Sequence, residues 1–336
     1  MSSNTEAPAD EAQPEIANDD VDGDNVTNSG GPTVGSAHSK ETGSTLENEG
    51  GEDETSQGNS REQGDASGDE NREEVEDEVD GKPVSGPPTQ FQAAVKGGAI
   101  KDFVSTLRAI VGEAKLTVTS EGISSRAVDP ANVAMYDVQF HSSAFESFDA
   151  SEGLLGVNLE RFEEVLKLAK KGDLVQMTFD TSTSKLVIHI DGVEFTMACI
   201  DPDSIRQEPQ LPEMDLPISF TIDEAQISRG VKAADMVSDH IRFRCDEATQ
   251  TVYVEAEGDT DDVSLELTSD EIDSLVPAEG NALFSLDYVK DLSREFPKSG
   301  SIALTFGQDW PMMMEYELAD GECDVLAMLA PRIQTD

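Results

Sequence analysis

The sequence has 336 residues, of which 70 are acidic and 23 basic, giving a formal net charge of −47 at pH 7. Its three cysteines and four histidines are scattered, which excludes a disulfide framework and the usual zinc-binding spacings. The longest apolar runs are far shorter than a membrane span, and Met1 is followed by polar, acidic residues rather than by a signal peptide. We therefore expect a soluble protein of a reducing, cytoplasmic compartment.

The first 90 residues differ in composition from the rest. Residues 1–90 contain 24 acids, 4 bases and no Phe, Tyr or Trp. Such a segment cannot bury enough apolar surface to offset the entropy lost on ordering. The composition predicts a disordered, acidic N-terminal extension over residues 1–90. The alternative is a small folded domain, but this segment contains no periodic apolar run.

Residues 91–336 contain every aromatic residue and enough aliphatic residues for a core, with 46 acids against 19 bases. Acids spread this evenly indicate a surface adapted to molar salt, where the Debye length is about 3 Å and self-repulsion is screened. An ordinary acidic protein in dilute salt is the alternative.

The first half of this part begins with a short strand and an amphipathic helix near 98–112. Ile100, Val104 and Leu107 recur there at helical spacing. Strands are expected at 116–119 and 135–140, and a second helix at 156–171 with Asn158 as its N-cap. Alternating apolar residues predict closing strands at 173–179, 185–190 and 194–200.

A second half repeats this order. Residues 201–217 contain four prolines and are therefore expected to form an extended connector. Helices are then predicted at 223–237 and at 284–296, the latter with Ser285 as N-cap. The strands predicted in this half are 241–245, 251–255, 263–267, 301–306, 312–318 and 325–329. The repeat predicts an α+β fold of two similar β-rich domains, 91–200 and 218–336, each with two helices on one sheet face.

No motif for catalysis is present. The sequence contains no phosphate-binding glycine loop, no H-E-x-x-H and no G-x-S-x-G. The acidic run at 259–262 is more typical of a solvated charge cluster than of a metal site. We therefore expect no enzyme, no metal and no cofactor.

The few bases concentrate on the four predicted helices, which hold about half of them. They recur three, four or seven residues apart, so each pair projects from one side of its helix. This pattern favours a weak basic surface facing phosphates, and ordinary exposed Lys and Arg are the alternative. The ten are Lys101, Arg108, Arg161, Lys167, Lys170, Lys171, Arg229, Lys232, Lys290 and Arg294.

Several segments in order resemble the proliferating cell nuclear antigen (PCNA) family of DNA sliding clamps. They are Leu107-Arg-Ala-Ile-Val-Gly-Glu-Ala-Lys115, Val118-Thr-Ser-Glu-Gly122, Val128-Asp129, Gly156-Val-Asn-Leu159 and the C-terminal Leu329-Ala-Pro-Arg-Ile333. The resemblance implies a homotrimeric ring of six similar domains with sheets outside and helices lining the hole. The ring would encircle double-stranded DNA as a polymerase processivity factor, in an archaeal protein of halophilic type.

The resemblance also implies site residues. All ten bases except Arg161 become DNA-facing. Segments 193–200 and 251–258 become the edge strands between subunits, with interface residues Val193, Phe195, Met197, Val252, Val254 and Ala256. DNA polymerase, clamp loader, ligase and nuclease would insert short hydrophobic motifs at a partner site formed by Val128, Val133, Leu211, Pro212, Pro311, Met328, Leu329, Ala330 and Pro331.

Two alternatives stay open. Within the same fold, the chain could serve as a specialised or heterotrimeric repair or checkpoint clamp. In a different class, it could be an acidic binding module that does not bind DNA. The clustering of bases on helices distinguishes the clamp from that module.

Overall fold

The computed structural model describes residues 84–207 and 214–333. Most of the predicted disordered extension lies outside these residues, as do Leu211 and Pro212 of the predicted partner site. Residues 84–90, by contrast, lie against the fold: Pro88 is buried, and the Gly86 carbonyl accepts a 2.7 Å hydrogen bond from Leu154 N. No helix in the described ranges is long and apolar enough to cross a membrane.

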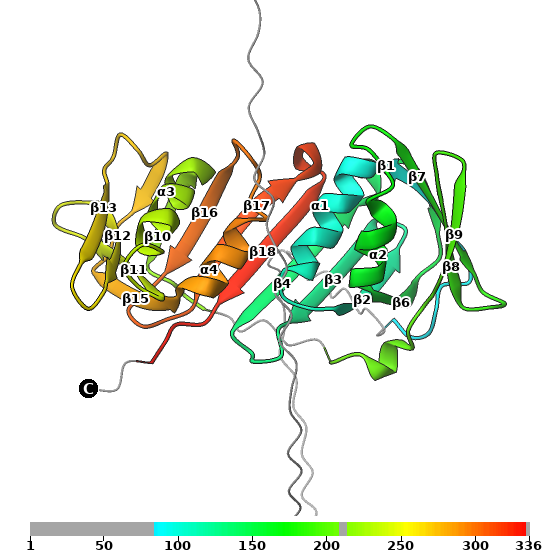
Figure 1. The fold of residues 1–336 in the computed structure, drawn as a ribbon, viewed down its shortest axis with the longest axis horizontal. Coiled ribbons are helices and arrows are strands. Elements are labelled where there is room, and N and C mark those ends of the chain that lie inside the picture. The colour runs from blue at the N-terminus through cyan, green and yellow to red at the C-terminus, as the bar shows by residue number, and fades with distance from the viewer. Residues whose placement is uncertain (1–83, 208–213, 334–336) are drawn as a thin grey trace, which may run out of the picture. The chain divides into compact units, whose positions relative to one another are not determined.

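The two halves have the same order of elements, strand, helix, five strands, helix and three strands (Figure 1). The first half comprises β1 Phe91–Lys96, α1 Gly97–Arg108, β2 Glu113–Thr119, β3 Gly122–Val128, β4 Ala134–His141, β5 Phe145–Ala150, β6 Gly153–Asn158, α2 Leu159–Leu166, β7 Leu174–Asp180, β8 Lys185–Ile190 and β9 Val193–Ala198. The second comprises β10 Ile218–Asp223, α3 Glu224–Ala234, β11 His240–Asp246, β12 Thr251–Glu257, β13 Asp262–Leu267, β14 Ser274–Val276, β15 Gly280–Ser285, α4 Leu286–Ser293, β16 Ser301–Phe306, β17 Met312–Leu318 and β18 Cys323–Leu329. The predicted duplication is confirmed.

The strands form three antiparallel sheets. A five-stranded sheet from the first half has the order β5-β1-β7-β8-β9, and a four-stranded sheet from the second half has the order β13-β12-β11-β15. A nine-stranded sheet, β14-β10-β16-β17-β18-β4-β3-β2-β6, draws on both halves. Each strand of the first half corresponds to the strand nine places later, so the second half repeats the first in its order of elements.

The two halves meet where β4 pairs with β18. The register runs from Ala134 opposite Leu329 to Phe140 opposite Cys323. On the same side of this junction, Tyr136 and Val138 of β4 and Val325 and Ala327 of β18 are buried. Buried residues alternate with more exposed ones along most of both strands, so each strand has one face in the core. Because β4 pairs with β18, the two halves share one continuous sheet.

The four helices of the described residues lie on one side of the sheets (Figure 1). α1 buries Ile100, Phe103, Val104 and Leu107 on one face, and the Phe103 ring stacks on Phe140 with centroids 5.3 Å apart. Burial of such side chains is worth about 1.5–3 kcal/mol each. The predicted amphipathic stripes thus hold the helices on the sheets.

The second helix of each half begins further along the chain than the sequence predicts. Residues 156–158 and 284–285 belong to β6 and β15, so α2 begins at Leu159 and α4 at Leu286. The Asn158 side chain accepts a 2.8 Å hydrogen bond from Arg161 N, which confirms this N-cap. Ser285 precedes α4 but makes no such side-chain bond. Strand β5 was not expected because its sequence, Phe-Glu-Ser-Phe-Asp-Ala, is polar, yet it is paired with β1.

A buried carboxylate fastens the second half to the first. Asp129 follows β3, is 3 % exposed, and accepts hydrogen bonds from Ala131 N, Val133 N and Ala134 N at 2.6–2.8 Å. Its Oδ2 also accepts a 2.7 Å bond from the Tyr288 hydroxyl on α4. Desolvation opposes ionisation of Asp129, but these hydrogen bonds outweigh it and lower its pKa.

We expect Asp129→Asn to lower the free energy of unfolding by about 1–3 kcal/mol at pH 7, because a charged acceptor of several buried bonds is removed. The folded-state pKa lies below the unfolded value of about 3.9, so this contribution is complete at neutral pH. It disappears as the pH falls through the folded-state pKa. Urea unfolding at constant salt and several pH values measures the difference from the original chain.

The control is Asp270→Asn, which removes an exposed carboxylate and should change stability little. A stability difference for Asp129→Asn that persists undiminished well below pH 4 would contradict the assigned role of the carboxylate.

Candidate nucleic-acid interface and partner surface

The predicted DNA-facing bases lie on the helix side, but not all of them are on helices. Because α2 ends at Leu166, Lys167 is its C-cap and Lys170 and Lys171 lie in the following loop. Arg294 is likewise the C-cap of α4. The other predicted bases, Lys101, Arg108, Arg229, Lys232 and Lys290, lie on α1, α3 and α4 as expected.

The loop after α2 brings three lysines together at the start of α1. Gly98 N donates a 2.9 Å hydrogen bond to the Lys171 carbonyl, and the Lys101 ammonium donates to the Ala169 carbonyl. A Cβ at Gly97 would lie 2.5 Å from the Lys170 carbonyl oxygen, so only glycine permits this approach. The basic corner, Lys101, Lys170 and Lys171, is therefore built by tertiary packing of α1 on the loop.

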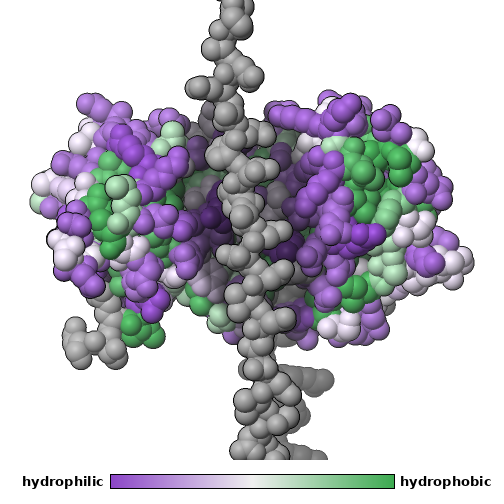
Figure 2. Space-filling view, viewed as in Figure 1, coloured by the Kyte–Doolittle hydropathy of each residue, from purple (hydrophilic) through white to green (hydrophobic). Residues whose placement is uncertain are grey.

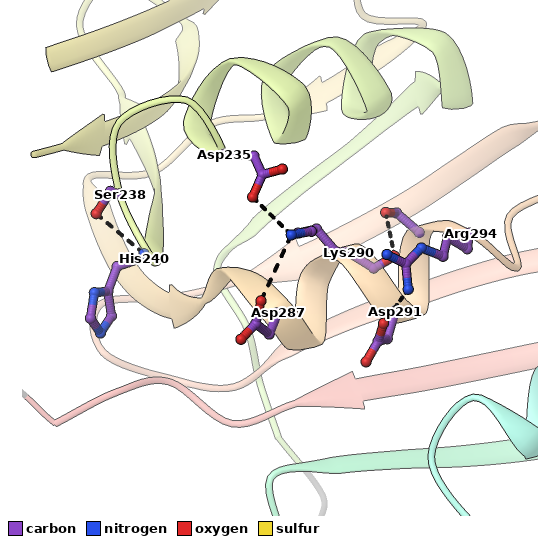
Figure 3. Close-up of polar contacts among 8 residues, drawn as sticks. Asp235, Ser238, His240, Asp287, Lys290, Asp291 and Arg294 are labelled. Atoms are coloured by element: carbon purple, nitrogen blue, oxygen red, sulfur yellow. Dashed lines mark hydrogen bonds and ion pairs between the residues drawn. The ribbon is translucent and has the colours of Figure 1, made fainter. Parts of the chain in front are cut away.

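Several of the other bases are neutralised by neighbouring acids. Lys290 is 2.8 Å from Asp235 at the end of α3 and 3.8 Å from Asp287 on its own helix (Figure 3). The hydrogen bond from Lys290 to Asp235 raises the pKa of Lys290. Arg294 is bound by Asp291, Arg229 lies 3.1 Å from Glu271, and Lys167 lies 4.0 Å from Glu163. These bases present little net positive charge to a ligand.

Five predicted bases have no ion-pair partner among the described residues. They are Lys101, Arg108, Lys170, Lys171 and Lys232. The visible helix face is mainly hydrophilic, with hydrophobic areas toward its two ends (Figure 2). The surface can therefore approach a polyanion, but its attraction depends on a few free cations.

A hollow of about 590 Å³ adjoins the basic corner and includes a base that the helix pattern missed. Lys101, Lys171, Arg294 and Lys298 line it together with Asp102 and Glu295. Partial burial and the nearby carboxylates raise the pKa of Glu295. Lys298 follows Pro297, beyond the predicted helix, so a count of helical bases could not include it. Acids thus offset the bases here too.

The structure brings two of the predicted partner residues into contact and contradicts the prediction for a third. Ala330 N donates a 2.8 Å hydrogen bond to the Val133 carbonyl, which brings the segment 330–331 beside the β3–β4 turn. Val128, Pro311, Met328 and Pro331 are half-buried and accessible. Leu329 has no exposed surface because it faces the core in β18, so it cannot contact a partner.

The β3–β4 turn also receives the interdomain connector. Arg206 Nη1 donates a 2.7 Å hydrogen bond to the Asp129 carbonyl, and its other terminal nitrogen bonds to Asn132. Burial and the hydrogen bond to Asp129 raise the pKa of Tyr288 to about 12, which keeps its hydroxyl a donor at neutral pH. Sequence reasoning identified neither Arg206 nor Tyr288 as a neighbour of this turn, because both contacts are long-range.

One of the two predicted edge strands is wrong. β9 is an edge strand, with Val193 48 % exposed, Phe195 half-buried and Met197 buried. β12 is hydrogen-bonded to β11 on one side and β13 on the other, so 251–258 offers no edge. Val252, Val254 and Ala256 are accordingly buried inside the second half. The edge strand next to β12 is β13, and β15 is the edge strand at the other side of that sheet.

Among the described residues, no group of three or more His, Cys, Asp and Glu side chains is placed to hold a metal ion. The surfaces with functional character are therefore the basic helix side, the β3–β4 turn with the C-terminal segment, and the edges β9 and β13.

Known proteins share both the sequence and this arrangement. The family model "Proliferating cell nuclear antigen, N-terminal domain" matches residues 90–203. The "DNA polymerase sliding clamp" of Natronomonas pharaonis is 46 % identical over 246 residues, 73 % of this chain and 100 % of the relative. That of Methanosarcina mazei is 39 % identical over the same shares of the two chains.

Solved structures agree with the sequence relatives. A structure described as the C-terminal region of FEN-1 bound to A. fulgidus PCNA has a TM-score of 0.70 and 32 % identity, covering 73 % of this chain and 100 % of that chain. PCNA from Thermococcus kodakaraensis has a TM-score of 0.66 and 26 % identity, covering 72 % and 100 %. The chain therefore belongs to the proliferating cell nuclear antigen family of DNA sliding clamps.

Proposed function

We propose that three copies of this chain form a closed ring that encircles duplex DNA and tethers replication and repair enzymes to it. The observation that carries this proposal is that both strands of the internal junction have duplicates, and that these duplicates lie at open sheet edges. β18 pairs with β4 inside the chain. Their counterparts in the other half, β9 and β13, are edge strands at opposite ends of the described fold (Figure 1). Pairing β9 of one copy with β13 of the next repeats the internal junction around a ring.

The internal register gives the register between copies. Val325 lies opposite Val138, Ala327 opposite Tyr136 and Cys323 opposite Phe140. Val193 and Phe195 correspond to Val325 and Ala327, and Leu265 and Val263 correspond to Val138 and Tyr136. The internal register thus places Val193 opposite Leu265 and Phe195 opposite Val263. Both pairs are apolar, and Val263 and Leu265 are half-buried in the single chain. Pairing would satisfy two open backbone edges and bury these side chains.

The helices would then line the hole, and domains 91–200 and 218–336 would alternate around it, each pair joined by the connector 201–217. The weak net charge of the helix side fits this arrangement. Phosphate contacts weaken steeply as salt rises, so in molar salt a few lysines cannot hold an enzyme on DNA. A closed ring is held by topology and can slide while it binds weakly. It raises the effective concentration of whatever it tethers.

The role requires no chemistry of its own, so we propose a non-enzymatic protein. Its partners would dock at the β3–β4 turn and at the accessible residues Met328, Ala330 and Pro331, where Ala330 N donates to the Val133 carbonyl. The FEN-1 region bound to the A. fulgidus relative supports this kind of partner. We further propose that the ring works in the cytoplasm, on the nucleoid, and that residues 1–90 form an extension to it.

Topological binding predicts that the protein, once loaded onto nicked circular DNA by a clamp loader with ATP, is largely retained through gel filtration. Cutting the circle with a restriction enzyme should release most of it, because the ring slides off the ends. Retention that does not drop after linearisation would sink the proposal. Uncut circles carried through the same steps are the control.

For the subunit interface, Phe195→Ala should shift the protein from three chain masses toward one, because the β9 edge is deprived of its largest apolar side chain. Light scattering over a dilution series at fixed salt measures this. Phe148→Ala is the matched control, since Phe148 is a half-buried phenylalanine on β5, the opposite edge of the same sheet. The control should keep the trimer. Equal dissociation of both variants would argue against the β9 edge.

For the DNA-facing side, the double variant Lys171→Gln, Lys232→Gln should weaken binding to duplex DNA by about three- to tenfold at low salt. The slope of log affinity against log salt should fall by about 0.9 for each phosphate that the protein no longer neutralises. The control double variant Lys115→Gln, Lys185→Gln removes the same charge from β2 and β8, where the neighbouring Leu116 and Leu186 face the core. Identical salt slopes for the two variants would contradict a basic lining.

A further inference from the structure

The internal junction carries a polar contact as well as backbone pairing. The Tyr288 hydroxyl on α4 donates to Asp129, which directly follows β3 in the turn that leads into β4. α4 thus reaches across β18 to the turn beside β18's partner strand. Any junction built on the same plan should have its own contact at this place.

The counterpart of Tyr288 is a charged residue. α2 begins Leu159-Glu-Arg161-Phe, and α4 begins Leu286-Asp-Tyr288-Val, so Arg161 occupies the position of Tyr288. The Arg161 guanidinium lies over the Phe195 ring of β9, 4.8 Å from the ring centroid. Arg161 therefore stands on the open edge β9, as Tyr288 stands beside β18.

The counterpart of the β3–β4 turn is the β12–β13 turn. Ala127 pairs with Tyr136 in the first, and Ala256 pairs with Val263 in the second, which places Gly258 at the position of Asp129. Gly258 has no carboxylate, but Asp259, Asp261 and Asp262 follow it and are all exposed. None of these three has an ion-pair partner among the residues that the structure describes.

Apart from the Phe195 ring, the local surroundings of Arg161 give a cation little stabilisation. Arg161 is in the first turn of α2, where the positive end of the helix dipole disfavours a base. Its partner Glu164 lies 2.6 Å away, but both side chains are about half exposed, and such pairs contribute little. An acidic surface brought against β9 by a second copy would explain it.

We infer that Arg161 of one subunit binds the acidic β12–β13 turn, Asp259 to Asp262, of the next subunit. This contact rests on the proposed ring and would replace, between copies, the Tyr288–Asp129 contact within the chain. It gives each subunit boundary an exposed Arg–Asp ion pair at the place where the internal junction has a buried Tyr–Asp hydrogen bond. Because exposed ion pairs are screened by salt, the strength of the subunit boundary should respond to salt.

The test is a double-mutant cycle on the dissociation of the trimer, followed by light scattering over a dilution series at fixed salt. The single variant is Arg161→Gln, the turn variant carries Asp259→Asn and Asp261→Asn, and the third combines them. Arg161→Gln should raise the concentration at which the trimer half-dissociates by about three- to tenfold. The combined variant should show clearly less than the product of the two separate effects.

The control is Arg294→Gln at the C-cap of α4. Arg294 is an exposed arginine that, like Arg161, is paired with an acid three residues away, here Asp291. It should leave the trimer unchanged, and circular dichroism should show that all variants fold. Raising the salt should shrink the effect of Arg161→Gln, because an exposed ion pair is screened.

Strictly multiplicative effects of the two changes, or no effect of Arg161→Gln, would overturn the contact while leaving the ring intact. An original chain that does not form a trimer at all would instead refute the proposed ring, so the two failures are distinguishable.

Discussion

The antiparallel pairing of β4 with β18 is the interaction on which the rest of the described fold depends. Backbone donors and acceptors at a strand edge must be paired, covered or left to water. This pairing joins the two halves into one nine-stranded sheet and holds all four described helices on one side. Because the halves are duplicates, it also leaves the equivalent strands β9 and β13 at open edges. The geometry of the internal junction thereby supports the proposed junction between copies.

Charge determines how the helix side can bind a polyanion. The folded part is strongly acidic, and even on the helix side Lys290, Arg294 and Arg229 are engaged by carboxylates. Few bases on the described part of this side lack an ion-pair partner, and three of them belong to the basic corner. A surface of this kind gives weak, salt-sensitive attraction to phosphates. Encirclement is the mechanism that this surface suits, since it holds DNA without strong contact.

Polar contacts distinguish the two kinds of junction. Inside the chain, Asp129 is desolvated but fully satisfied by backbone amides and Tyr288, which makes that junction a fixed part of the fold. At the open edge, Arg161 and the β12–β13 acids are exposed and would meet only in the proposed ring. A permanent junction thus uses a buried, satisfied carboxylate, and a reversible one uses exposed charge.

The sequence by itself determined the duplication, the amphipathic helices, the Asn158 N-cap and the position of most bases, because these depend on local periodicity and capping. Which strand lies at an edge was decided only by the tertiary structure: β12 and β13 have similar alternating patterns, and only the pairing order makes β13 the edge. The same holds for Leu329, whose burial follows from the β4–β18 junction, and for the Asp129–Tyr288 bond across 159 residues. Local patterns fix which face of an element is apolar, whereas long-range pairing decides what that face meets.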